Sequence, residues 1–145
     1  MTLAIPVTLA TASVLGVLYV VLSAAVTSER GRSKVGLGTG GETSVALGTE
    51  HKASRLLIAV RRHGHFAEYV PISLILLLVL ELSGAQRIWL YGLASALVLS
   101  RLMIMLGMGM AAPNLLRAGG NTVNWGMILA ASVYGLVLIV GHWNG

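Results

Sequence analysis

The sequence predicts an all-α membrane protein, a four-transmembrane-helix up-down bundle. Of the 145 residues, 56% are hydrophobic and only 10% are charged, whereas roughly 25% are charged in a typical soluble domain. The hydrophobic residues gather in four runs, and a helix needs about 20 residues to cross a hydrocarbon core of ~30 Å. We expect one integral membrane domain over residues 1–145, with helices at about 4–27, 53–83, 88–110 and 121–143 and a loop at about 28–52.

The first two predicted helices differ in polarity. Met1 to Ser28 carries no charge, and no basic residue precedes it, so a retained helix is favoured over a cleaved signal peptide. The second run, residues 53–83, is longer than the core and polar in its first half. Pro71 lies inside it and is expected to kink the helix, because proline removes a backbone hydrogen bond.

The third and fourth predicted helices are joined by a short turn. Arg101 is the one charge within residues 88–110, and Pro113 is expected to stop this helix. Gly119 and Gly120 are expected to complete the turn before a last, uncharged helix begins at Asn121.

The basic residues predict the orientation. Lys and Arg concentrate in the loop at 28–52 and at the start of the second helix, whereas both termini lack them. The positive-inside rule therefore places this loop in the cytoplasm and both termini outside it. Nucleic-acid binding is disfavoured, because the charges are few and tied to membrane edges. Residues 36–41 match G-x-G-x-x-G, but they lack the strand and helix of a dinucleotide site, so a mobile linker is expected.

Polar residues inside the membrane predict a binding site. Arg61, His65 and Glu68 follow helical spacing and share one face. Arg101 lies at a similar depth on the third helix, so Glu68 and Arg101 are expected to pair, within a chain or across a subunit interface. Seven residues converge on the cytoplasmic half: Arg61, His65, Glu68, Arg101, Arg117, Asn121 and Asn124. Such an arginine-rich pocket favours a small anionic ligand from the cytosol, because arginine binds carboxylates with a bidentate fork.

The remaining polar residues do not predict a second binding site. Glu81 and Arg87, at the outer side, are interpreted as an interfacial pair. The chain has no cysteine, and His63 and His65 are two residues apart, so they point to different faces of a helix. No metal site is expected.

Residues 60–72 read VRRHGHFAEYVPI, which resembles the MAPEG signature R-x-x-x-N-x-x-E-Y-x-P (membrane-associated proteins in eicosanoid and glutathione metabolism). Arg61, Glu68, Tyr69 and Pro71 match it in identity and spacing. The segment around Arg101 is similar to the family's third-helix arginine segment, and residues 38–41 stand where the bacterial branch has G-x-G-G.

This resemblance implies a homotrimer in a bacterial inner membrane, surrounded by lipids, with glutathione as cosubstrate. Glutathione would bind between subunits near the cytoplasmic side and attack a lipophilic electrophile or reduce a peroxide. Carried over by position, Arg117 would be the catalytic residue that stabilises the thiolate. The glutathione-binding residues would be Arg61, His65, Glu68, Tyr69 and Arg101.

Two departures from the family pattern leave an alternative open. His65 replaces the motif asparagine, and Ile104 and Met108 stand where active enzymes have polar or tyrosine side chains. A non-enzymatic protein of the same fold, binding a lipid or a small anion, is therefore the second hypothesis. A small proton-coupled exporter is disfavoured, because such exporters need a glutamate in the first helix, and residues 4–27 carry no charge.

Overall fold

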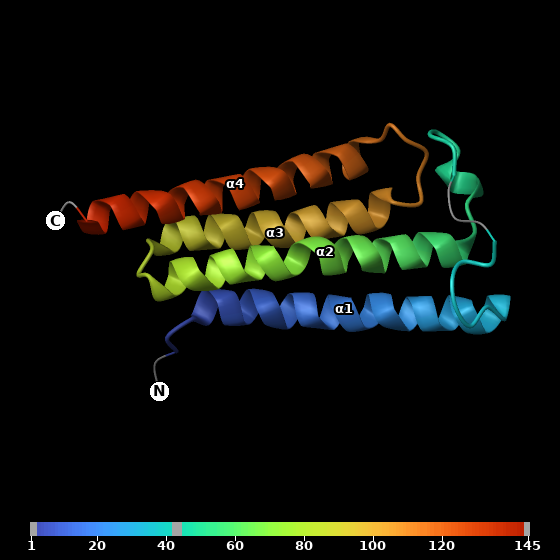
Figure 1. Cartoon of the computed structure of the whole chain (residues 1–145), viewed down its shortest axis with the longest axis horizontal. Helices are drawn as coiled ribbons and strands as arrows, with labels where there is room; N and C mark the ends of the chain where they lie inside the picture. Colours follow the sequence, from blue (N-terminus) through green and yellow to red (C-terminus); the bar gives the residue numbers. More distant parts are fainter. Residues whose placement is uncertain (1–2, 42–44, 144–145) are drawn as a thin grey trace.

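The computed structural model describes residues 3–41 and 45–143, and every regular element in these two ranges is helical. Four long helices run up and down the bundle, and a short 3₁₀ helix lies in the loop after the first (Figure 1). The elements are α1 (Pro6–Ser33), η1 (Glu50–Lys52), α2 (Arg55–Leu82), α3 (Arg87–Gly107) and α4 (Leu115–Trp143). Each of α1 to α4 is long and apolar enough to span a membrane. The predicted four-helix membrane bundle is confirmed, and the chain is a multi-pass integral membrane protein.

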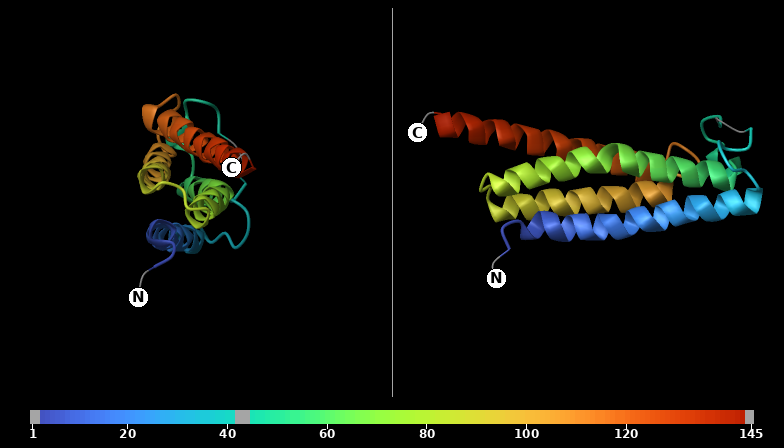
Figure 2. Two further views of the ribbon diagram at one scale, coloured as in Figure 1. Left: turned by 90° about the vertical axis from the view of Figure 1, so that its left-hand side faces the viewer. Right: turned by 60° about the horizontal axis from the view of Figure 1, so that its bottom comes forward.

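The bundle has two distinct ends (Figure 1). The start of α1, the turn between α2 and α3, and the end of α4 lie together, and we call this the terminal end. The α1–α2 loop and the α3–α4 connection lie at the opposite end, which we call the loop end. The interior between the two ends is largely apolar, with a few buried polar residues, and its leucines include Leu15, Leu77 and Leu97, all at most 1% exposed. In Figure 2, α4 diverges from the other helices toward the terminal end.

The loop end of α1 differs from expectation. The helix continues past residue 27 to Ser33, and Lys34 ends it in the left-handed conformation with a φ of 55°. Arg30 then folds back on the glycine-rich segment, donating to the carbonyls of Gly36 and Gly38 at 3.2 and 3.0 Å. This part of the loop is therefore bound to α1 rather than a free linker.

The terminal end of α1 is capped by a carboxylate from α2. The first amides of a helix have no partner within the helix. Here Glu81 accepts hydrogen bonds from the amides of Val7 and Thr8, at 2.9 and 2.7 Å. Among the described residues Glu81 and Arg87 form no ion pair within 4 Å, although Arg87 is near enough to interact electrostatically with the carboxylate. The expected interfacial pair is therefore not a direct contact. The carboxylate instead joins α2 to the positive end of the α1 dipole.

The α3–α4 connection also differs from expectation, because α4 begins at Leu115 and not at residue 121. Asn114 starts the helix by accepting from the amide of Arg117 at 2.8 Å. Its side-chain amide donates back to the carbonyls of Gly107 and Ala111, at 3.3 and 3.2 Å. One side chain therefore caps α4 and closes the connection. The helix before it, α3, ends at Gly107, six residues before Pro113, so Pro113 is not the residue that stops it.

Gly119 and Gly120 lie inside α4 and not in a turn. Their role is close contact with α3. A Cβ placed on Gly120 would lie 2.6 Å from Cγ1 of Ile104 and 3.0 Å from the carbonyl oxygen of Ser100. Small residues of this kind let helices approach closely in membranes.

Candidate functional site

The polar residues at the loop end form two separate groups. The first lines a cavity of about 270 Å³, which we call the loop-end cavity. It lies between the α1–α2 loop, the start of α2, the turn after α3 and the start of α4. Its wall is made by Val45, Leu47, Glu50, Ala53, Leu57, Ile58, Arg61, Met108 and Arg117. Two guanidinium groups, one carboxylate and an apolar wall thus surround a space near the lower limit for small-molecule sites, roughly 300 Å³.

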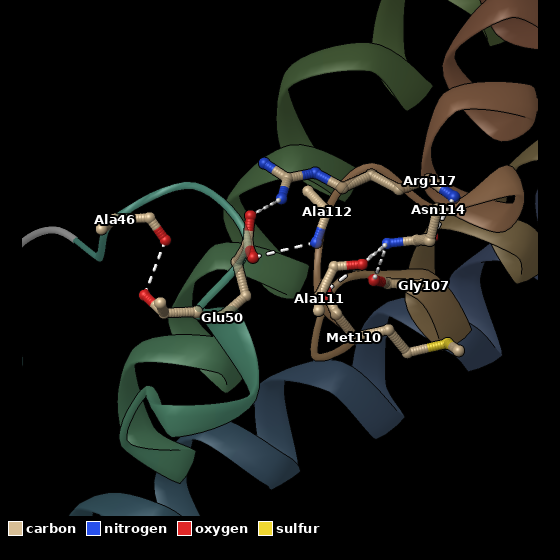
Figure 3. Close-up of polar contacts among 9 residues, drawn as sticks. Ala46, Glu50, Gly107, Met110, Ala111, Ala112, Asn114 and Arg117 are labelled. Atoms are coloured by element: carbon tan, nitrogen blue, oxygen red, sulfur yellow. Dashed lines mark hydrogen bonds and ion pairs between the residues drawn. The ribbon is translucent and has the colours of Figure 1, made fainter.

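Glu50 fastens the loop over this cavity (Figure 3). One carboxylate oxygen, Oε1, lies 3.2 Å from Nη1 of Arg117, and the other accepts from the amide of Ala112 at 3.0 Å. The hydrogen bond from Ala112, helped by other backbone amides and by Arg117, lowers the pKa of Glu50 below its ordinary value. Glu50 is therefore a carboxylate at neutral pH. We call this set of contacts the Glu50 latch.

The second group lies deeper, between α2, α3 and α4, and we call it the inner cluster. Arg101 is its centre and is only 1% exposed. Its Nη1 lies 3.3 Å from Nδ1 of His65, and its Nε donates to Oγ of Ser100 at 3.3 Å. The guanidinium carbon lies 5.6 Å from the ring centroid of Tyr69, and the rings of His65 and Tyr69 stack at 4.7 Å. On the α4 side, Nε2 of His65 lies 3.1 Å from Oδ1 of Asn121.

These contacts define the state of His65. A guanidinium group only donates hydrogen bonds, so Nδ1 of His65 must accept from Arg101. Nε2 then carries the proton and donates to the side-chain oxygen of Asn121. His65 is therefore neutral in this arrangement, and it links α2 to both α3 and α4.

Glu68 belongs to neither group. Its side chain is exposed on the outer face of α2, and it makes no hydrogen bond or ion pair among the described residues. The expected Glu68–Arg101 pair within the chain is wrong. Pairing across a subunit interface stays a prediction. Arg101 is 1% exposed within one chain, and its Nη2 has no hydrogen-bond partner among the described residues. His65, and not Glu68, provides the side-chain acceptor for the Arg101 guanidinium group.

The residues expected to bind one ligand are therefore divided. Arg61 and Arg117 face the loop-end cavity, whereas His65, Tyr69 and Arg101 form the inner cluster. Asn121 joins that cluster through His65. Asn124 is 1% exposed, and its side-chain atoms have no hydrogen-bond partner in the parts of the chain that are described.

The two departures from the family pattern have different surroundings. Ile104 is 3% exposed and fills the space against Gly120, so it is a packing residue. Met108 lines the loop-end cavity beside the arginines. Sequence reasoning missed Glu50 and Asn114. No sequence signal set Glu50 apart, since Glu29 and Glu42 lie in the same predicted loop. Asn114 follows Pro113 directly before a helix, which is a common position for a cap.

Comparison with known proteins gives one match. A model of the MAPEG family matches residues 8–137, nearly the whole of the described chain. No curated protein and no solved structure matches the sequence.

Proposed function

Since the chain belongs to the MAPEG family, we propose that it is a glutathione-dependent membrane transferase or peroxidase acting on lipophilic electrophiles. The observation that supports this most directly is the loop-end cavity, where Arg61 and Arg117 line one space together with Leu57 and Met108. Glutathione carries two carboxylates and a thiol, and arginine forks match carboxylates. The apolar wall would receive a lipophilic second substrate.

In this proposal Arg117 holds the thiolate. A free thiol has a pKa of ~8.5, so only a few per cent of it is ionised at pH 7 without help. A positioned cation favours the ionised form, which is the nucleophile. Arg61 would bind a carboxylate of glutathione at the other side of the cavity. His65, Tyr69 and Arg101 would support the site from the inner cluster by fixing the packing of α2 against α3 and α4.

Glu68 fits the proposal only in an assembly. It faces outward from α2, so it would meet glutathione where a neighbouring subunit packs against this face. We therefore propose a homotrimer with glutathione bound between subunits. The Glu50 latch adds a competitor, because Nη1 of Arg117 already pairs with the Glu50 carboxylate at 3.2 Å.

The orientation that we propose places the loop end in the cytoplasm of a bacterial inner membrane and both termini outside it. The basis is the concentration of Lys and Arg at the loop end. Gly36→Cys and Gly141→Cys provide labelling sites, because nothing lies within 4 Å of either added Cβ. The thiol of Gly36→Cys should react with an impermeant thiol reagent only after the membrane is opened, and the thiol of Gly141→Cys should react before it is opened. The opposite pattern would contradict this orientation.

Glutathione binding in detergent, followed by calorimetry and by ultraviolet absorbance at pH 7, tests the proposed function. The wild type should bind glutathione and show thiolate absorbance. Arg117→Ala should lose the absorbance but retain most of the affinity, because Arg61 still binds a carboxylate. Arg117→Ala also leaves Glu50 unpaired in the cavity, so the double variant with Glu50→Gln is the matched control. Unchanged absorbance in both variants would contradict the role of Arg117.

A non-enzymatic protein of this fold, binding a lipid or a small anion, is the second candidate. The observation that favours it is the Glu50 latch, which already pairs the proposed catalytic arginine, together with the absence of a hydroxyl group on Met108. Glutathione binding without thiolate absorbance in the wild type would favour this candidate over the enzyme.

A further inference from the structure

A second hollow lies at the loop end, on the side of α2 that faces α1. Its volume is about 430 Å³, and its wall combines residues of α1, α2 and the end of α3. The polar lining is Glu29, Arg55 and Arg62, and the apolar lining includes Ala25, Ala59 and Leu106. Arg61 faces the loop-end cavity and Arg62 faces this hollow, because consecutive helical residues point about 100° apart.

The positive charge of this hollow is not balanced within the described chain. Glu29 is its one acid, and it is already bound by Arg32 at 2.8 Å. Neither Arg55 nor Arg62 makes an ion pair or hydrogen bond with the residues that the structure describes. The Nε of Arg62 is buried without an acceptor. A buried donor on a charged group is costly without a partner, so an anion is the missing component.

The Arg62 side chain reaches across to the end of α3. A Cβ placed on Gly109 would lie 3.3 Å from Nη2 of Arg62 and 3.6 Å from the side chain of Ile58. The guanidinium group of Arg62, on α2, therefore lies next to the α3–α4 connection at this glycine. Glycine at this position leaves room for the arginine.

The hollow places charged side chains next to apolar ones. Arg55 is the first residue of α2 and is exposed at the loop end, whereas Ala25, Ala59 and Leu106 lie on the spanning parts of α1, α2 and α3. Arg62 lies two turns farther along α2 than Arg55, and its guanidinium group is close to Gly109 after the end of α3. The charged groups therefore stand beside the apolar wall. This arrangement fits an anion that is joined to an acyl chain better than a fully solvated one. Basic pockets between transmembrane helices are typical sites for anionic lipid headgroups.

We propose that this hollow binds an anionic phospholipid, with its phosphate between Arg55 and Arg62 and an acyl chain along the apolar wall. The site is separate from the loop-end cavity, and it does not depend on glutathione chemistry. Its occupant would join α1 to the α3–α4 connection through the Arg62 guanidinium group.

Native mass spectrometry of the protein with phosphatidylglycerol or phosphatidylcholine, together with melting in the same lipids, tests this proposal. The wild type should retain phosphatidylglycerol preferentially and melt at a higher temperature in it. Arg62→Gln should weaken that binding about tenfold, the effect of losing one charge-assisted contact. Arg55→Gln is the second variant, since its exposed side chain can be removed without disturbing the fold. Arg87→Gln, at the terminal end, is the matched control and should bind as the wild type does.

Three results would overturn the proposal. The first is equal retention of the two lipids by the wild type. The second is unchanged binding of phosphatidylglycerol in both Arg55→Gln and Arg62→Gln. The third concerns the source of the phosphate: inorganic phosphate alone should not reproduce the stabilisation. If it does so in an Arg62-dependent way, the site binds a soluble anion and not a lipid.

Discussion

Replacing His65 with leucine is expected to lower the melting temperature in detergent sharply. The change removes the side-chain acceptor of Nη1 on Arg101, a guanidinium group that is almost fully buried. A buried charge that loses a partner costs about 3 kcal/mol or more, far more than a surface contact. It also removes the link to Asn121, so α2 loses its polar contact with α4.

Three comparison variants sharpen this test. His65→Asn retains an acceptor oxygen and should lose less stability than His65→Leu. The double variant His65→Leu with Arg101→Met removes the charge together with its acceptor, so it should recover part of the loss. Glu68→Gln should melt as the wild type does, because Glu68 is exposed and unpaired in the described chain. Wild-type melting of His65→Leu would contradict the inner cluster, and a large loss in Glu68→Gln would restore a structural role for that carboxylate.

Gly120→Ala is expected to destabilise the bundle by about 1–3 kcal/mol, the usual effect of overpacking. The new methyl group would meet the side chain of Ile104 and the backbone carbonyl of Ser100. The carbonyl is part of the α3 backbone and cannot move aside, so the two helices must separate. Thermal melting in detergent gives the size of the loss.

Gly126→Ala, on the same helix, is the matched control. Nothing lies within 4 Å of its added Cβ. Alanine is favoured over glycine in helices by up to about 1 kcal/mol, so this variant should melt at or above the wild-type temperature. If both variants melt alike, close approach of α3 and α4 at Gly120 does not contribute to stability.

The bundle could be predicted because four apolar runs of membrane length leave few other folds for the chain. The beginning of α4 could not. Gly119 and Gly120 resemble a turn in isolation, and only the nearness of Ile104 shows that they serve helix packing. The capping role of Asn114 likewise depends on the path of the connection in three dimensions.

The sequence predicted which residues lie near the candidate site better than it predicted which of them contact one another. Helical spacing shows which residues share a face of one helix, but it does not give the rotation of that helix relative to its neighbours. Glu68 and Arg101 therefore matched in depth and still face different surroundings. The pairing of Glu50 with Arg117 joins residues that are 67 positions apart, and no local pattern in a glycine-rich loop encodes it.

The Glu50 latch makes anion affinity at Arg117 a difference between two competing ion pairs. A ligand that needs the open form binds with its intrinsic affinity reduced by the fraction of molecules in which the latch is open. An anion with a single weak contact would be rejected, whereas one that also engages Arg61 gains a second contact to offset the exchange. Because the pKa of Glu50 is lowered, the carboxylate persists at pH values below the ordinary pKa of glutamate and is protonated only as the pH falls through the lowered value. If the proposed function holds, the loop would therefore favour anions that carry more than one charged group.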